Sequence, residues 1–215
     1  MARTFALSWK RLDPEPADDA LARTILARAA WFAARDALPR DRLRASVGIE
    51  KEGNAAAAAF ARGLARVHEL GLATPTPRAG APILHRLVAA SIRGSIGSEV
   101  SEAAWVEVEQ AVVTKESGIN AHGDPRPLLA WQLQLRALAK AAERDGRPDA
   151  PLLLKELGDH LRIVVDLAGA RAAFERALAI DERVHGPDHP NVAITVNNLR
   201  LVLRAGLSGR SQGGP

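Results

Sequence analysis

The sequence has no cysteine and no tyrosine, and its single methionine is Met1. A chain without cysteine forms no disulfide, offers no thiol nucleophile and binds no zinc through thiolates. Aromatic residues make up only 4% of the 215 residues. No stretch reaches the roughly 18 uncharged apolar residues that a membrane helix needs, and the first ten residues lack the apolar core of a signal peptide. We therefore expect a soluble, cytoplasmic protein.

Helix-forming residues dominate what is present. Alanine supplies 42 residues, leucine 27 and arginine 24, and all three have high intrinsic helix propensity. Hydrophobic residues at 47% and charged residues at 25% are ordinary values for a globular protein. The composition predicts a mainly α fold in which small side chains let helices approach closely.

The first 97 residues predict a small domain with one β-hairpin. Hydrophobic spacing predicts five helices, over residues 3–12, 18–34, 39–45, 55–70 and 85–95. Before the last of these, the proline-rich stretch predicts two short strands, at 72–74 and 82–84. Asp18 or Asp19 is suited to cap the second helix, and Gly71 to end the fourth in a left-handed conformation. This order of elements predicts a winged-helix-like domain over residues 1–97.

The middle of the chain predicts a helical hairpin. Residues 94–98 read Gly-Ser-Ile-Gly-Ser and predict a joint after the first domain. Two longer helices are predicted over 99–117 and 125–144, followed by a break at residues 145–148. We assign residues 98–149 to this helical linker.

Residues 150–205 contain the most specific pattern in the sequence. Small and large apolar residues alternate at the positions that pack the two helices of a tetratricopeptide repeat (TPR): Leu157, Gly158, Leu161, Ala170, Phe174 and Ala177. Residues 174–190 closely resemble the longer repeat subtype of kinesin light chains, with a period of 42. Leu157 and Leu161 recur as Leu199 and Leu203 at that period. We expect about one and a half repeats, a truncated TPR solenoid, followed by a flexible tail over 206–215.

A solenoid of fewer than three repeats buries little continuous core. We expect helices 99–144 to act as the missing neighbour and the chain to be the remnant of a longer design. The last helix would then expose Leu199, Val202 and Leu203. We therefore expect self-association through this end.

The front half resembles the winged-helix segment of the NB-ARC/STAND signalling ATPases, which often leads into TPRs. The resemblance lies in residues 4–9, 29–32 and 38–43, and then in 64–72 and 83–88, which resemble the end of that domain, where the family's Met-His-Asp motif lies. His85 matches the motif histidine, which in that family approaches the ADP phosphates, whereas Leu84 and Arg86 depart from the motif. The resemblance implies a regulatory context, and an ADP-sensing role for His85 is one alternative.

Catalytic signatures are missing from the sequence. It contains no phosphate-binding loop, no His-Glu-x-x-His pair and no Gly-x-Ser-x-Gly elbow. His185 and His189 are separated by Gly186 and Pro187, so they do not share a helix face. The acid pairs, such as Asp181 with Glu182, are expected to be caps and solvated faces. We expect no enzymatic activity, no cofactor and no metal.

A basic first domain keeps a DNA-binding regulator open as an alternative. Residues 1–98 carry 15 basic and 9 acidic residues. The helix over 55–70, in the position of a recognition helix, offers only Arg62 and Arg66 to phosphates. We therefore expect nucleic acid binding to be the weaker interpretation.

The sequence favours a protein-interaction module that binds a protein or peptide on the face made by the first helix of each repeat. Asn197 and Asn198 matter most, because an amide side chain both donates to and accepts from a peptide backbone. Solvation of these two side chains is the competing interpretation. By repeat position, the expected binding residues are Leu152, Lys155, Glu156, Asp159, Arg162, Ile194, Asn197, Asn198, Leu201 and Arg204.

Overall fold

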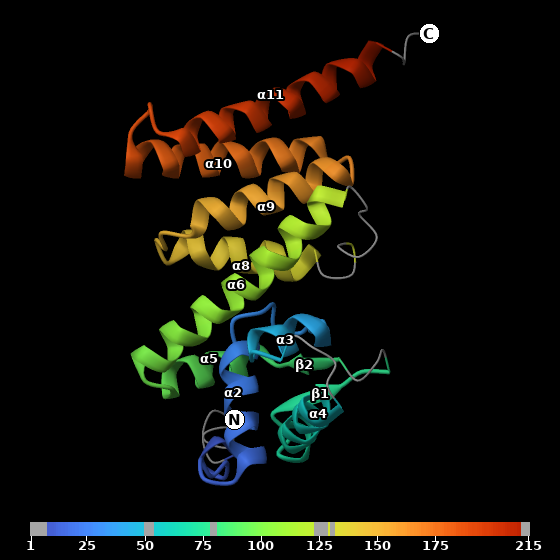
Figure 1. The fold of residues 1–215 in the computed structure, drawn as a ribbon, viewed down its shortest axis with the longest axis vertical. Coiled ribbons are helices and arrows are strands. Elements are labelled where there is room, and N and C mark those ends of the chain that lie inside the picture. The colour runs from blue at the N-terminus through green and yellow to red at the C-terminus, as the bar shows by residue number, and fades with distance from the viewer. Residues whose placement is uncertain (1–7, 50–53, 78–80, 123–128, 130–131, 212–215) are drawn as a thin grey trace. The chain divides into compact units, whose positions relative to one another are not determined.

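The computed structural model describes residues 8–49, 54–77, 81–122, 129 and 132–211. The chain forms two compact units, Met1–Val112 and Val113–Pro215. The described residues are mainly helical, with one two-stranded antiparallel sheet (Figure 1). Among the described helices, none is long and apolar enough to cross a membrane.

The first unit alternates helices with a small hairpin. Its elements, in chain order, are α2 (Ala17–Ala29), α3 (Arg40–Ser46), α4 (Asn54–Glu69), β1 (Ala73–Pro75), β2 (Pro82–Leu84), α5 (Arg86–Ser95) and the first half of α6 (Ser98–His122). In the hairpin, Ala73 pairs with Leu84 and Thr74 with Ile83. Ala37, between α2 and α3, forms an isolated antiparallel bridge to Ile83, so a third extended segment lies beside β2.

The core of this unit lies between α2 and α4. Ile25 and Leu26 of α2 and Phe60 and Leu64 of α4 are buried. Gly63 lets the two helices approach closely, because a Cβ placed there would lie 3.0 Å from the Leu21 side chain. Helical spacing of the apolar residues therefore gives one continuous packed layer.

The first half of α6 packs into the same unit. Trp105 is buried and meets Trp31 edge to face, with ring centroids 5.1 Å apart. Glu107 forms an ion pair with Arg28 of α2. The division between the units therefore falls inside α6, between Val112 and Val113, and not at the glycine- and serine-rich joint over 94–98.

Most elements predicted for this unit are confirmed to within two residues, and Gly71 has the expected positive φ of 66°. Two details differ. The second helix ends at Ala29, and Pro16 occupies its N-cap without a side-chain cap. Asp19 accepts instead from the backbone N–H of Asp13, at 3.0 Å. Of the helix predicted over 3–12, residues 3–7 lie outside the described residues and residues 8–10 are helical.

The second unit is a row of antiparallel helices. After the second half of α6 come α8 (Gln132–Arg144), α9 (Ala150–Ile163), α10 (Leu167–His185) and α11 (Pro190–Ser211). Each helix packs on the next, α8 on α9, α9 on α10 and α10 on α11 (Figure 1). The expectation that the preceding helices would supply a neighbour for α9 is therefore confirmed for α8.

The closest approach in this unit is between α9 and α10. A Cβ added to Gly158 would lie 2.7 Å from the ring of Phe174, closer than atoms normally come. The other residues of the predicted pattern, Leu157, Leu161, Ala170 and Ala177, are all buried. The glycine on α9 and the phenylalanine on α10 therefore act as one complementary pair.

Two expectations for this unit change. The last helix continues to Ser211, so residues 206–211 of the predicted tail are helical. The helix predicted over 125–144 is described from Gln132 on, and residues 125–128, 130 and 131 of the predicted range lie outside the described residues.

Candidate functional site: the exposed face of α9 and α11

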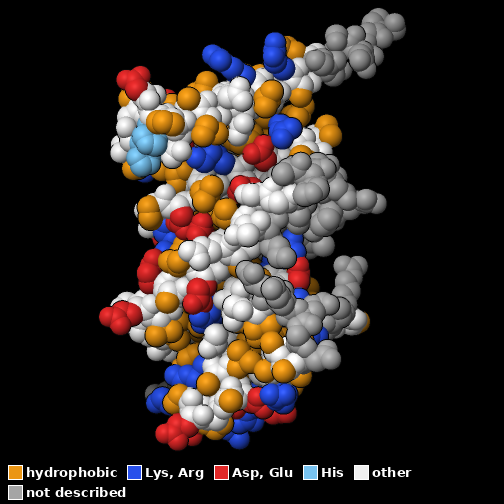
Figure 2. Space-filling view, in the orientation of Figure 1, with side chains coloured by type: hydrophobic (Ala, Val, Ile, Leu, Met, Phe, Trp, Pro, Cys, Tyr) orange, Lys and Arg blue, Asp and Glu red, His pale blue; other side chains and the backbone are white. Residues whose placement is uncertain are grey.

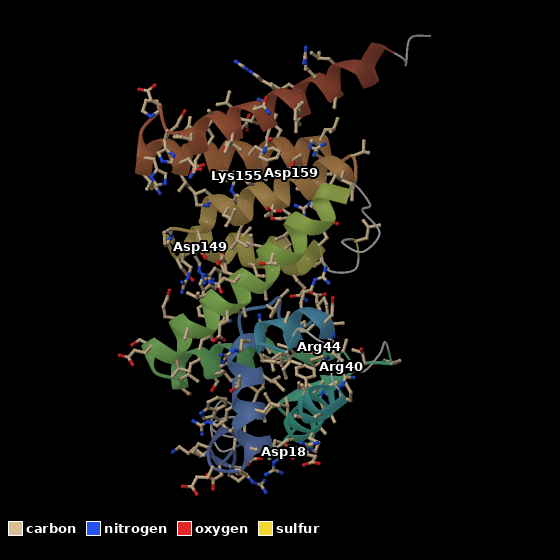
Figure 3. The ribbon with its side chains drawn as sticks, in the orientation of Figure 1. Asp18, Arg40, Arg44, Asp149, Lys155 and Asp159 are labelled. Carbon is tan, nitrogen blue, oxygen red and sulfur yellow. The ribbon has the colours of Figure 1, made fainter. Side chains whose placement is uncertain are left out.

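The five binding residues predicted on α9 occupy the side of the helix that faces away from its core. Leu153, Leu157 and Leu161 are buried on the opposite side. On the outer side Leu152 is exposed, and the polar residues that follow at helical spacing are half-buried: Lys155, Glu156, Asp159 and Arg162. Figure 3 marks Lys155 and Asp159 in succession along α9.

Lys155 is held by a buried polar network that joins three helices. Its Nζ lies 3.3 Å from Oδ2 of Asp181 on α10. The hydroxyl oxygen of Thr195 on α11 lies 3.4 Å from the same carboxylate oxygen and 2.9 Å from the backbone carbonyl of Asn191, to which it donates. Asp181 is only 1% exposed, and Thr195 is fully buried. A buried carboxylate needs such partners, because its desolvation is costly. Lys155 therefore anchors α9 to its neighbours as well as lining the surface.

Sequence reasoning had placed Asp181 on a solvated face, and this is wrong. Asp181 lies one turn after Ala177, so helical spacing alone places it on the buried face of α10. Thr195 is likewise buried, on the first turns of α11. Helical spacing could have identified both Asp181 and Thr195 as buried. Asp181 was nevertheless predicted to be solvated, because acidic residues are rarely buried.

The other polar residues of the α9 face are also paired. Arg162 lies 3.2 Å from the carboxylate of Asp159, and Ser117 of α6 donates to Glu156 at 2.6 Å. Burial raises the pKa of Asp159, and the Arg162 guanidinium opposes that shift. Much of the hydrogen-bonding capacity on α9 is therefore already used within the unit.

The predicted residues on α11 are more open to solvent. Ile194 is 54% exposed and Leu201 is 44% exposed, against 39% for Leu152 on α9. Asn197 and Arg204 are exposed and Asn198 is half-buried. Since α9 and α11 also touch each other, the two predicted sets lie on neighbouring helices. The predicted residues on these helices therefore include three exposed apolar side chains, Leu152, Ile194 and Leu201, together with the amides of Asn197 and Asn198.

A buried histidine lies behind this face. His160 of α9 is fully buried, and neither ring nitrogen has a hydrogen-bond partner in the part of the chain that the structure describes. Burial lowers the pKa of His160, and the nearby positive charge of Arg136 on α8 lowers it further. The side chain is therefore held as neutral imidazole at neutral pH.

The two arginines considered for DNA contact are both engaged by acids of α2. Nε of Arg62 lies 3.1 Å from Asp18, and Nε of Arg66 lies 2.6 Å from Asp19. Arg66 also contacts Glu69 at 3.3 Å. These pairs reduce the positive charge that α4 could direct at phosphates.

His85 has a structural task at the start of α5. Its Nδ1 accepts a hydrogen bond from the backbone N–H of Leu87 at 3.2 Å, so the ring caps the helix. The side chain is exposed. Histidine at this cap uses one ring nitrogen, and only Nε2 remains for any phosphate contact.

His185 and His189 come together, although their sequence context argued against a shared helix face. Their rings stack with centroids 4.4 Å apart, and Nδ1 of His189 accepts from the backbone N–H of Asn191. No group of three or more potential ligands among His, Cys, Asp and Glu occurs in the described residues. The pair is therefore a packing contact at the turn between α10 and α11.

No family model, curated protein or solved structure matches the chain. The function of the α9–α11 face must therefore follow from its side chains and from the packing that presents them.

Proposed function

We propose that this protein is a non-enzymatic interaction module that binds a protein or peptide on the α9–α11 face. In this proposal α9 and α10 are the two helices of a TPR, and α11 is the first helix of the next one. The single observation that carries the proposal is the exposure of Leu152 on α9 and of Ile194 and Leu201 on α11, the helix that also carries the amides of Asn197 and Asn198.

The packing supports the repeat assignment. A TPR joins two antiparallel helices through small residues that allow close approach, and the next repeat continues the stack. The contact of Gly158 with Phe174 is of this kind. The sequential packing of α8, α9, α10 and α11 is what a stacked array requires.

The first unit supports the wider resemblance to NB-ARC/STAND regulators. A helix, a bridging segment at Ala37, two helices and a hairpin follow in the order of a winged helix. In the proposed context this unit is a structural and regulatory element and not a DNA reader, since Arg62 and Arg66 are paired with Asp18 and Asp19.

The mode of binding follows from the chemistry of the face. An extended peptide has unpaired backbone N–H and C=O groups, and an asparagine amide satisfies one of each. Exposed leucine and isoleucine side chains beside the amides would bury apolar side chains of the same peptide. The expected partner is therefore an extended segment with apolar residues.

A double substitution tests this mode. Asn197→Ala with Asn198→Ala removes both amides from a helix surface, where alanine is well tolerated. We expect quantitative pull-down of partners from the source cells to fall about tenfold, as for the loss of roughly two hydrogen bonds. Gln110→Ala, which removes an exposed amide from α6, is the matched control. Capture that is unchanged in the double variant would refute the assignment of the two asparagines.

A further inference from the structure

The turn between α10 and α11 has a histidine on each side. α10 ends at His185, Gly186 follows with a positive φ of 84°, and α11 begins at Pro190. His189 directly precedes α11, and its carbonyl accepts a hydrogen bond from the backbone N–H of Val192. The two histidine rings stack with centroids 4.4 Å apart and 22° between their planes. Histidine side chains form an exposed patch over this turn (Figure 2).

The ring of His189 caps the start of α11. Its Nδ1 accepts a hydrogen bond from the backbone N–H of Asn191 at 3.2 Å. An imidazole nitrogen accepts only while it carries no proton, so the proton of the neutral ring is on Nε2. A second proton, on Nδ1, would place a donor against a donor and a positive charge at a helix N-terminus, where the helix dipole disfavours it. The cap therefore exists only while His189 is neutral.

The ring of His185 adds a second dependence on protonation. Two neutral imidazole rings stack without electrostatic repulsion, whereas two imidazolium rings at the same separation would bring like charges into contact. Both the cap and the stack are therefore weakened by protons.

The charged groups around the turn do not offset such charges in the observed arrangement. Asp181 lies one helical turn before His185, but its carboxylate is paired with Lys155 at 3.3 Å. Within the described part of the chain, neither His185 nor His189 forms an ion pair. The other charged residues on the elements around the turn are Glu182 and Arg183 at the end of α10, Asp188 in the turn, Arg147 and Asp149 in the α8–α9 connection, and Arg200, the first charged residue of α11.

The start of α5 has the same cap without the stack. Nδ1 of His85 accepts from the backbone N–H of Leu87, again two residues further on and again at 3.2 Å. Among the described residues, no second ring stacks on His85. The two helix starts differ in the second imidazole, so α5 provides an internal control for α11.

We propose that the stacked His185 and His189 form a proton-controlled latch that holds the first turns of α11 at the end of α10 at neutral pH and releases them in mild acid. Imidazole is the side chain whose charge changes between pH 5 and 8. Because protonation removes the cap and repels the stacked ring, the latch is closed above this range and opens as the pH falls through it. Ile194 lies on the released turns, so partner capture should also weaken in acid. That consequence rests on the proposed function, whereas the latch itself does not.

Hydrogen exchange of the full chain, followed residue by residue by NMR, tests the latch. The protection of the amides from Asn191 to Thr195 should fall at least about fivefold between about pH 7.5 and about pH 5.5, as for the loss of a helix cap. The amides in the middle of α10, from Ala173 to Ala177, should lose less protection, because the release is local. Unchanged protection at the start of α11, or an equal loss in α10, would overturn the proposal.

Three substitutions separate a latch from a purely structural contact. His189→Asn keeps a cap that does not titrate, so α11 should stay protected and the pH dependence should disappear. His185→Gln removes the stacked ring and should reduce the loss to that at the start of α5. His85→Asn is the matched control and should leave exchange at α11 unchanged. A loss that persists in His189→Asn, or that is equal at the starts of α5 and α11 in the unaltered protein, would refute the latch.

Discussion

At the scale of single residues, the choice of amino acid is most restricted at a closely packed glycine and at a residue with a strained backbone conformation. Gly158 exists as glycine because the Phe174 ring occupies the space of its Cβ. Gly94, also in a helix, has nothing within 4 Å of the same position. Val165 has a φ of 64°, a conformation that a β-branched residue rarely adopts. We therefore expect a larger side chain at Gly158 to lower the free energy of unfolding, and the loss of the side chain at Val165 to raise it.

Gly158→Ala should lower the free energy of unfolding by about 1–3 kcal/mol, because the added methyl group must displace the Phe174 ring or separate α9 from α10. Gly94→Ala is the matched control. It adds the same methyl group to a helix with open space around it, so it should leave stability unchanged or raise it by up to about 1 kcal/mol. Urea denaturation of both variants measures the difference, and equal effects would contradict the close contact.

Val165→Gly should raise the free energy of unfolding by about 1 kcal/mol, because glycine adopts positive φ without the steric cost that an L-residue incurs. The valine side chain is 75% exposed, so little packing is lost. Val164 has a φ of −83°, and Val164→Gly should therefore destabilise the fold. Thermal unfolding of the two variants should shift in opposite directions, and a destabilised Val165→Gly would mean that the positive φ carries no strain.

At the scale of elements, buried and paired charges decide how the helices are joined. Lys155, Asp181 and Thr195 connect α9, α10 and α11 through one carboxylate. Asp18 and Asp19 connect the start of α2 to Arg62 and Arg66 of α4. His160 is buried as a neutral ring on α9, and His68 of α4 likewise has a pKa lowered by burial and by Arg40. Helix contacts in both units therefore depend on protonation state.

The lowered pKa values of His160 and His68 predict that the fold weakens in mild acid. Each histidine has a lower pKa in the folded chain than its unfolded value of about 6.5, so the unfolded state binds more protons. Stability should be greatest above that value and should fall as the pH drops from about 7 to 5. Urea denaturation across this range should give a shallower decline for His160→Leu, and a decline as steep as that of the unaltered protein would show that His160 does not contribute.

The ion pairs of α4 predict little affinity for duplex DNA. At physiological salt we expect no gel shift with duplex DNA, because Arg62 and Arg66 already have carboxylate partners. Asp18→Asn with Asp19→Asn removes the carboxylate partners on α2, so that Arg62 loses its acid and Arg66 keeps only Glu69, and should increase non-specific binding at low salt. A gel shift by the unaltered protein that Arg62→Ala abolishes would favour the DNA-binding alternative instead.

At the scale of the whole molecule, α11 is packed on one side only by the described helices. The expectation that Leu199, Val202 and Leu203 would be exposed is partly wrong. Val202 is 2% exposed and Leu199 is half-buried, whereas Leu203 is 48% and Leu207 is 69% exposed. In Figure 2 the surface at this end mixes apolar and basic side chains. The residues available for self-association are therefore Leu203 and Leu207.

Self-association through α11 predicts a mass that rises with concentration in light scattering. Leu203→Ser with Leu207→Ser should keep the protein monomeric, because the apolar area that would drive the contact is removed. Val100→Ser with Val106→Ser, which removes two exposed valines from α6, is the control and should leave the mass unchanged. A monomer at all concentrations of the unaltered protein would refute this interface.

The sequence alone determined the helices, the hairpin and the apolar side of each element. These features depend on spacing along the chain, on proline and glycine positions and on side-chain size, all of which are local. Gly158 and Phe174 were both predicted to pack between two helices because the predicted repeat pattern encodes contact as spacing, whereas the contact of the Phe174 ring with Gly158 came from the structure. The same spacing predicted residues of α9 and α11 that lie off the buried side of each helix, although most of those on α9 are half-buried.

Only the tertiary structure decided which polar groups are paired. Asp181 was predicted to be solvated, but its side chain is buried. Lys155 was predicted to bind a partner protein, and in the structure it also forms an ion pair with Asp181. A groove between the end of α8, the α8–α9 connection and α10 brings together residues from Glu143 to Val184, and α6 contributes to both compact units. Ion pairs, grooves and unit boundaries depend on which segments far apart in the sequence come into contact. The free energy of burying a charge depends on the partners that these contacts supply, and the local sequence does not specify them.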